Sequence, residues 1–214
     1  MSMRRAIARL KRTIVITLVS KVVMPVMVPT GQVFSNKLGI FATDDPGMLA
    51  LISSASHYWW AIAWSPTMKA DLSYSPTDAF ETFPLVAATP EMQELGDRLD
   101  KFRRELMLAR QAGLTKSYNL VHDPRCKDSD IAELRAIHRR IDHAVAHAYG
   151  WDDLDLDHGF HETRQGTRYT VGPVVRQEIL DRLLELNHER YAAEVAAGLH
   201  KGGKKNPNDE GMLF

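Results

Sequence analysis

The segment Tyr74–Leu85 divides the chain into two parts with different patterns of apolar residues. Upstream of it, short runs of β-branched residues alternate with turn residues, a pattern typical of strands. Downstream, Thr89 precedes Pro90 and Glu91, a combination typical of the first turn of a helix. We expect the segment to bury two aromatic side chains, because large aromatic side chains favour the core. The chain should therefore pass here from a mixed region to a helical one.

The upstream part predicts short strands around one helix. The strands are expected at Thr13–Val19, Lys21–Val28, Gly39–Thr43 and Met68–Tyr74. Prolines at positions 25 and 29 restrict the second strand to an edge or a bulge, because proline donates no main-chain hydrogen bond. Residues 43–46 combine capping side chains, acids and a proline, and so predict the start of a helix over Gly47–Ala63.

The downstream part predicts three amphipathic helices, over residues 89–110, 129–150 and about 173–199. Their apolar residues recur every three or four positions, a spacing typical of a helical bundle. The predicted fold class is therefore α+β, with a short, incomplete mixed β-region with one helix followed by a three-helix C-terminal bundle. We expect domains at 13–88 and 89–200. Residues 1–12 form a basic start, either one helical turn or disordered, and 201–214 a disordered tail.

Charge is balanced overall but not along the chain. Lysines plus arginines and aspartates plus glutamates number 27 each, so net charge alone does not indicate a nucleic-acid-binding protein. Residues 1–40, however, contain no acid, and their basic residues are Arg4, Arg5, Arg9, Lys11, Arg12, Lys21 and Lys37. The excess of positive charge is therefore local to the N-terminal region.

The single cysteine and the apolar N-terminal run limit the cellular setting. Cys126 has no second cysteine with which to form an intrachain disulfide or a cysteine-based zinc site, which favours a reducing, cytoplasmic location. The run Thr13–Val19 is too short to span a bilayer, and Lys21 interrupts it. We interpret it as a buried strand and predict no membrane association.

No standard catalytic motif occurs in the chain, and a histidine-based metal site is a weak alternative. His143 and His147 are four residues apart on one predicted helix, a spacing that can hold a metal ion. A zinc hydrolase would also need a carboxylate base beside the first histidine, and position 144 is alanine. We therefore predict no catalytic residue and no metal site, and keep a metal hydrolase as the least favoured hypothesis.

Two further features could bind bases. The aromatic run His57–Trp60 could form a stacking platform, but aromatic clusters on a helix more often belong to the core. On the strand predicted over Met68–Tyr74, Lys69, Asp71 and Ser73 share one face. Lysine donates to guanine, aspartate accepts from cytosine, and serine does either, so this face could read base edges. A solvated strand face is the simpler interpretation of the alternation alone.

Several segments together resemble the C-terminal part of MmeI-like, type IIG restriction–modification methyltransferases. The resemblance covers about residues 15–200. It consists of the order and spacing of Thr30–Val33, Ser53–Ala61, Leu72–Ser75, Phe80–Pro84, Gly113–Asn119, His122–Pro124, Leu134–Asp142 and Ala148–Trp151.

The resemblance implies a role in recognising double-stranded DNA. The matching part of the family is the end of the target-recognition domain plus a C-terminal helical domain. In the full enzyme an upstream domain binds S-adenosylmethionine and methylates adenine, and its motifs are absent from this chain. Base-reading side chains of the family fall, by position, on Lys69, Asp71 and Ser73. With Arg4, Arg5 and Lys21 as phosphate contacts, these are the DNA-binding residues that we predict.

The resemblance also implies that the chain is a fragment without catalysis or cofactor of its own, either a truncated gene product or a separately encoded piece. It would then supply sequence readout to a separate methyltransferase chain. The alternative is a helical protein-interaction module without DNA readout. In that case the apolar seam Met92–Ala109 would pair with a partner helix.

Overall fold

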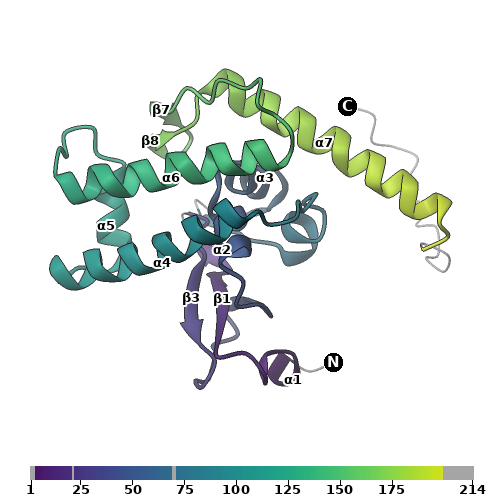
Figure 1. Cartoon of the computed structure of the whole chain (residues 1–214), viewed down its shortest axis with the longest axis horizontal. Helices are drawn as coiled ribbons and strands as arrows, with labels where there is room; N and C mark the ends of the chain where they lie inside the picture. Colours follow the sequence, from purple (N-terminus) through teal and green to yellow (C-terminus); the bar gives the residue numbers. More distant parts are fainter. Residues whose placement is uncertain (1–2, 21, 69–70, 200–214) are drawn as a thin grey trace.

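The computed structural model describes residues 3–20, 22–68 and 71–199, which form an α+β fold as predicted (Figure 1). The helices are α1 (Met3–Ile7), α2 (Pro46–Ser53), α3 (Ala55–Trp64), the π-helical turn η1 (Pro76–Phe80), α4 (Pro90–Ala109), α5 (Leu114–Val121), α6 (Ser129–Ala148) and α7 (Pro173–Ala196). The strands are β1 (Arg12–Thr17), β2 (Val19–Ser20), β3 (Val26–Pro29), β4 (Leu38–Phe41), β5 (Thr67–Met68), β6 (Asp71–Ser73), β7 (Gly159–Thr163) and β8 (Gly166–Thr170). The tail predicted to be disordered lies outside the described residues.

The strands form small antiparallel sheets, in the orders β3-β1-β4, β2-β6-β5 and β7-β8. Strand β1 corresponds to the β-branched run that predicted it, and β4 to the predicted third strand. The second predicted strand, Lys21–Val28, is wrong over most of its length, since β3 begins only at Val26. Pro25 directly precedes β3 and cannot donate to a neighbouring strand, which explains why pairing starts after it.

The predicted single helix Gly47–Ala63 is two helices, α2 and α3, that meet at Ser54. Ser54 has an extended backbone, and its hydroxyl accepts a hydrogen bond from the amide of His57, so it caps the start of α3. A serine inside a helical pattern can compete with the helix by bonding to the main chain. The predicted start of α2 is confirmed, because the carboxylate of Asp45 accepts a hydrogen bond from the amide of Gly47 at 2.8 Å.

The three predicted long helices are confirmed as α4, α6 and α7, and Thr89 caps α4 as expected. Helix α5 and the hairpin β7–β8 were not predicted from the sequence. Helix α7 packs on α3 and extends away from the body, whereas α4 and α6 lie side by side with α5 at one end (Figure 1). The helical part is therefore not a self-contained three-helix bundle, because its third helix joins the core through the upstream half.

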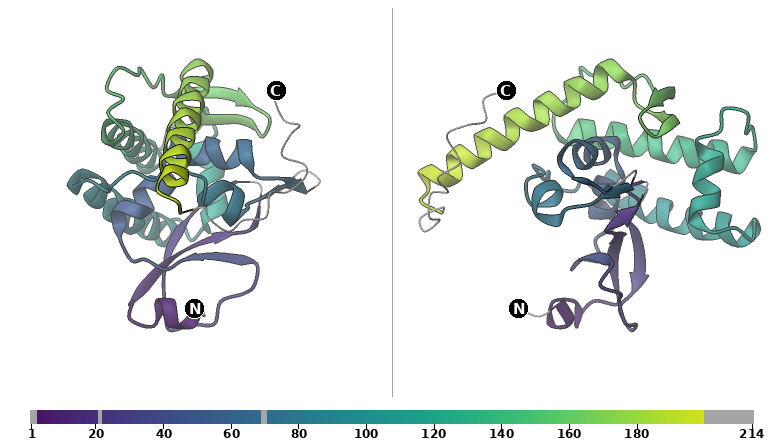
Figure 2. Two further views of the ribbon diagram at one scale, coloured as in Figure 1. Left: turned by 90° about the vertical axis from the view of Figure 1, so that its right-hand side faces the viewer. Right: turned by 180° about the vertical axis from the view of Figure 1, so that it is seen from behind.

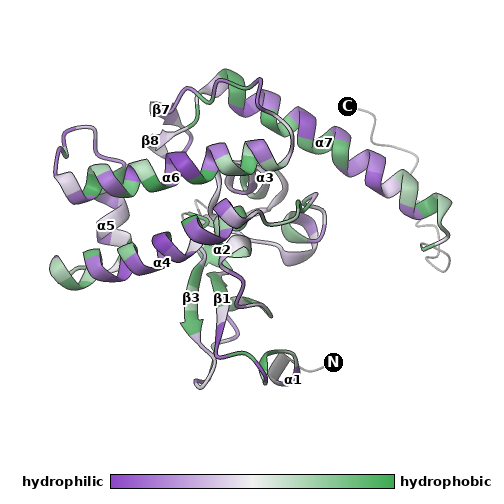
Figure 3. Cartoon of the chain, viewed as in Figure 1, coloured by the Kyte–Doolittle hydropathy of each residue, from purple (hydrophilic) through white to green (hydrophobic). Residues whose placement is uncertain are grey.

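The main hydrophobic core contains residues from both sides of the segment Tyr74–Leu85. Its largest cluster combines residues of α2 and α3 with residues of α4 to α7, for example Trp60, Leu95 and Ile137. The apolar face of α4 lies in this core, and Figure 3 shows the same alternation of hydrophobic and hydrophilic positions along α4, α6 and α7. The predicted division into domains at residues 88 and 89 remains a prediction.

The upstream strands project from this core. Side chains at alternate positions of β1 attach this strand to the rest of the protein. Ile14 packs with Leu49 and Ile52 of α2. Ile16 packs in a second cluster with Ala61 and Tyr74. Sheet β3-β1-β4 and α1 extend away from the layer formed by α4 and α6 (Figure 2). The sheet β3-β1-β4 therefore projects from the helical part of the protein.

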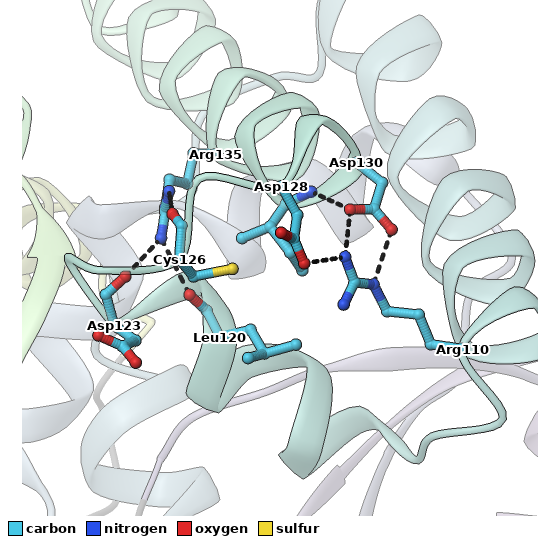
Figure 4. A network of polar contacts seen from close by, with 8 residues as sticks. Arg110, Leu120, Asp123, Cys126, Asp128, Asp130 and Arg135 are labelled. Atoms are coloured by element: carbon cyan, nitrogen blue, oxygen red, sulfur yellow. Dashed lines mark hydrogen bonds and ion pairs between the residues drawn. The ribbon is translucent and has the colours of Figure 1, made fainter.

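Two arginines fix the connection between α5 and α6 (Figure 4). The buried guanidinium of Arg135 donates hydrogen bonds of 2.8–2.9 Å to the main-chain carbonyls of Leu120, Val121, Asp123 and Cys126. Its central carbon, Cζ, lies over the ring of Phe160 on β7, 4.9 Å from the ring centroid. Arg110 binds Asp128 and Asp130 at the start of α6. Arg135 thus satisfies the end of α5 and anchors the β7–β8 hairpin.

Candidate nucleic-acid interface

The predicted reading face lies on a hairpin rather than on one continuous strand. Strands β5 and β6 are antiparallel, with Met68 paired to Asp71, so the single strand predicted over Met68–Tyr74 is wrong. Strands β5 and β6 thus run in opposite directions, where the prediction had one strand continuing. Lys69 lies outside the described residues. Asp71 and Ser73 flank Leu72 on β6.

Strand β6 keeps the predicted alternation. Leu72 and Tyr74 are buried, with exposed fractions of 7% and 4%. Ser73 lies between them in an extended strand, so its side chain is on the opposite side of the sheet and remains half-buried. Its cross-strand neighbour is Val19 of β2, which is 44% exposed. This outer face of the small sheet can present side chains to a partner.

Main-chain hydrogen bonds hold Ser73 rigidly. Its amide donates to the carbonyl of Pro66 at 2.9 Å, and the following amide, of Tyr74, donates to the carbonyl of Leu18 at 2.7 Å. The amide of Leu18 in turn donates to the carbonyl of Lys37 at 2.9 Å. Leu18 thus links the two upstream sheets and brings the main chain of Lys37 to about 10 Å from that of Tyr74, two strand spacings.

The predicted phosphate-contacting residues are only partly described. Arg4 and Arg5 lie on α1, where the side chain of Arg5 is exposed, and Lys21 lies outside the described residues. Within the described ranges, exposed basic side chains without an ion pair also occur at Arg9, Lys11 and Lys37. They lie at both ends of β1, which spans about 20 Å. Arg12 differs, because it pairs with Asp100 of α4.

The other predicted sites do not assemble. His57, Trp59 and Trp60 are buried, which confirms that the aromatic run belongs to the core. His143 and His147 are exposed, and His147 pairs with Asp152 at 2.7 Å. Among the residues that the structure describes, no group of three or more histidine, cysteine, aspartate or glutamate side chains could hold a metal ion. No helix in the described ranges is long and apolar enough to cross a membrane.

The apolar seam that would have bound a partner helix is also occupied. Met92, Leu95, Leu99 and Leu106 are all buried in the core of the protein itself. Helix α4 packs with this face against α2 and α6. The interaction-module hypothesis therefore loses the surface on which it was based.

Comparisons with known proteins identify the upstream half. Residues 11–87 match the family model described as "MmeI, target recognition domain". Residues 11–87 form an MmeI-like target recognition domain. This domain contains β1 to β6, α2, α3 and η1, and hence both Ser73 and Lys37.

A solved structure has the same arrangement over most of the chain. It is that of the type IIL restriction–modification enzyme MmeI in complex with DNA, and the match has a TM-score of 0.58 at 17% sequence identity. The match covers 85% of this chain and 22% of that chain, so the protein spans less than a quarter of the enzyme. At this identity the likeness concerns the fold, in which helices follow the target recognition domain. No curated protein sequence matches the chain.

Proposed function

We propose that the protein recognises a DNA target for an adenine-specific restriction–modification methyltransferase. The observation that carries this proposal is the match of residues 11–87 to a target recognition domain. Methyl transfer would come from a separate methyltransferase chain in the cytoplasm. That chain would use S-adenosylmethionine as its cofactor. The chain itself would contribute readout.

The geometry suggests how readout would be divided. Base edges in the major groove offer hydrogen-bond donors and acceptors that a strand can contact. Ser73 lies on β6, which is hydrogen-bonded to β2 on one side and to the main chain of Pro66 on the other. Asp71 and Lys69 are the proposed companions of Ser73. Lys37, Lys11 and Arg5 would contact phosphates, which positions the protein on the duplex without reading sequence.

A binding experiment with two kinds of variant tests this division. Because the target is unknown, a pool of duplexes with a randomised segment is selected on the full chain, and the enriched duplex is titrated by fluorescence anisotropy at several salt concentrations. Lys37→Ala should weaken binding to all duplexes equally and reduce the slope of log K against log salt by about one. Ser73→Ala should instead relax the preference at one base pair, with a loss of about 1–3 kcal/mol on the enriched duplex.

Arg140→Ala is the matched control, because Arg140 is equally exposed but lies on α6, outside the target recognition domain. It should leave both the affinity and the salt slope unchanged. Binding that stays unmeasurable at low salt would refute DNA recognition by the chain. An effect of Arg140→Ala as large as that of Lys37→Ala would refute the proposed position of the interface.

A further inference from the structure

A small, partly open cavity lies where the target recognition domain meets the helices that follow it. Its volume is about 90 Å³. Its walls come from the connection before β3, the junction of α2 and α3, helices α4, α5 and α6, and strand β8. A single water molecule needs a cavity of about 10–15 Å³, so this cavity has room for a group of several atoms.

The cavity gathers unpartnered polar atoms. In the described part of the chain, the buried side-chain polar atoms without a hydrogen-bond partner are Oγ of Ser53, the hydroxyl oxygen of Tyr58 and Nε of Arg168. All three residues line this one cavity. Buried polar groups are nearly always hydrogen-bonded, because an unpaired one loses its hydration without compensation. Their convergence indicates an occupant.

The unpartnered groups require an acceptor. The Nε of arginine can only donate, and the two hydroxyls can donate as well. The charge of Arg168 lies close enough to Tyr58 to oppose the rise in the pKa of the Tyr58 hydroxyl that burial causes. An occupant with several acceptor oxygens could bind Arg168 and both hydroxyls at once.

The cavity also has a surplus of positive charge. Arg103 lines it and is buried, and its guanidinium donates to the hydroxyl of Tyr118 at 2.6 Å and to the carbonyl of Pro25 at 2.9 Å. No described carboxylate pairs with Arg103 or Arg168. A buried charge without a counterion is strongly unfavourable. An anion in the cavity would reduce this excess of positive charge.

The histidines on the cavity wall do not supply the missing charge. Burial, together with the positive charges of Arg168 and Arg135, lowers the pKa of His122 to about 4. The pKa of His138 lies well below its usual range for the same reason, with Arg103 as the nearby charge. Both imidazoles are therefore neutral at pH 7 and add no further positive charge beside the arginines.

The carboxylate of Asp142, which also lines the cavity, already has two hydrogen-bond partners. One oxygen of Asp142 accepts a hydrogen bond from the amide of Ala55 at 2.7 Å, at the start of α3. Its other oxygen lies 2.8 Å from Nε2 of His158. Both oxygens of Asp142 are therefore hydrogen-bonded elsewhere, and neither bonds to Arg103 or Arg168.

We propose that this cavity binds a small oxyanion of the phosphate or sulfate type, held by Arg168, Tyr58 and Ser53. The anion would reduce the excess of positive charge between the target recognition domain and the helices. This site does not depend on DNA recognition, because its lining groups lie between the two halves of the protein. Oxyanion binding can therefore be measured without DNA and stands or falls separately from the proposed function.

Isothermal titration calorimetry of the full chain with inorganic phosphate, in a chloride buffer of constant ionic strength, tests the proposal. Wild type should bind one phosphate per chain, and phosphate should raise the unfolding temperature. Arg168→Gln should weaken binding roughly tenfold or more, since a charge-assisted hydrogen bond is lost. Tyr58→Phe removes only a hydroxyl and keeps the ring, so it should weaken binding several-fold while the protein stays folded.

Arg164→Gln is the matched control, because Arg164 is an exposed arginine between the strands of the same hairpin. It should bind phosphate as wild type does. Because phosphate and sulfate stabilise proteins in general by exclusion from the surface, only a difference between variants supports the site. No saturable heat in wild type, or equal stabilisation of wild type, Arg168→Gln and Tyr58→Phe, would overturn the proposal and leave water as the occupant.

Discussion

The imidazole of His57 and the hydroxyl of Tyr74 lie 3.0 Å apart inside the target recognition domain. The other ring nitrogen of His57 lies 2.9 Å from the carbonyl of Ile52, which can only accept, so Nδ1 carries the proton. Nε2 must then accept from the hydroxyl of Tyr74. This pair connects the start of α3 to the residue that follows β6, and so ties the strand of Ser73 to the core.

Removing the Tyr74 hydroxyl should destabilise the protein. Tyr74→Phe keeps the ring but leaves Nε2 of the fully buried His57 without a donor, which should lower the free energy of unfolding by about 1–3 kcal/mol. Urea unfolding measures it. A double-mutant cycle with His57→Leu should give a coupling energy of at least about 0.5 kcal/mol. Additive effects of the two substitutions would show that the pair does not interact.

Stability should fall in mild acid because of His57. Burial lowers its pKa from 6.5 to about 4 in the folded protein. Below pH 6.5 the unfolded chain therefore binds a proton that the folded chain does not, and stability is lost as the pH falls from about 6.5 to about 4. This side chain alone should cost roughly 3 kcal/mol across that range. Urea midpoints measured between pH 7.5 and pH 4 check the prediction, and a flat profile contradicts it.

Alanine at position 96 should disrupt the packing of α2 on α4. A Cβ atom on Gly96 would overlap the carbonyl oxygen of Pro46, at the start of α2. In an open helix Gly→Ala stabilises by about 1 kcal/mol, but here we expect destabilisation of about 3 kcal/mol or more. Gly31→Ala is the control, since its Cβ would meet no atom within 4 Å. Equal thermal unfolding of the two variants would contradict the close approach.

Loss of the Arg135 guanidinium should loosen the connection between α5 and α6. Arg135→Met keeps the stem but removes the guanidinium that donates to the carbonyls of Leu120, Val121, Asp123 and Cys126, at an expected cost of about 3–5 kcal/mol. Arg135→Lys should restore little, because one ammonium cannot reach all four oxygens. Hydrogen exchange should show faster exchange at residues 120–126. Arg139→Met, at an exposed position of α6 outside this segment, should leave this exchange unchanged.

Local signals account for the elements that the sequence analysis identified. The capping threonine and proline of α4, the acid and proline of α2 and the β-branched run of β1 each act within a few residues, so their effect can be read from the sequence. The same signals failed where two local preferences compete. Ser54 fits a helical pattern but caps a new helix instead, and the segment around β6 fits one long strand but folds into a hairpin.

The candidate interface was only partly predictable. Alternation along β6 indicated that Ser73 and Leu72 face opposite ways, which the burial of Leu72 and Tyr74 confirms. No local signal indicated that Lys37 lies near β6. The two come close because the main chain of Leu18 is hydrogen-bonded to Lys37 on one side and to Tyr74 on the other. The partnership of Arg12 with Asp100 was equally hidden, since 88 positions separate the two residues.

The sequence by itself determined the α+β character, the change from strands to helices after Tyr74–Leu85, and the start of each long helix, because apolar periodicity and capping operate within one or two turns. Only the tertiary structure decided that α4 buries its apolar seam inside the protein, and that Ser53, Tyr58 and Arg168 surround one cavity. Those outcomes depend on which distant surfaces pack together. Packing is set by the fit of the whole core, and no short segment of sequence specifies that fit.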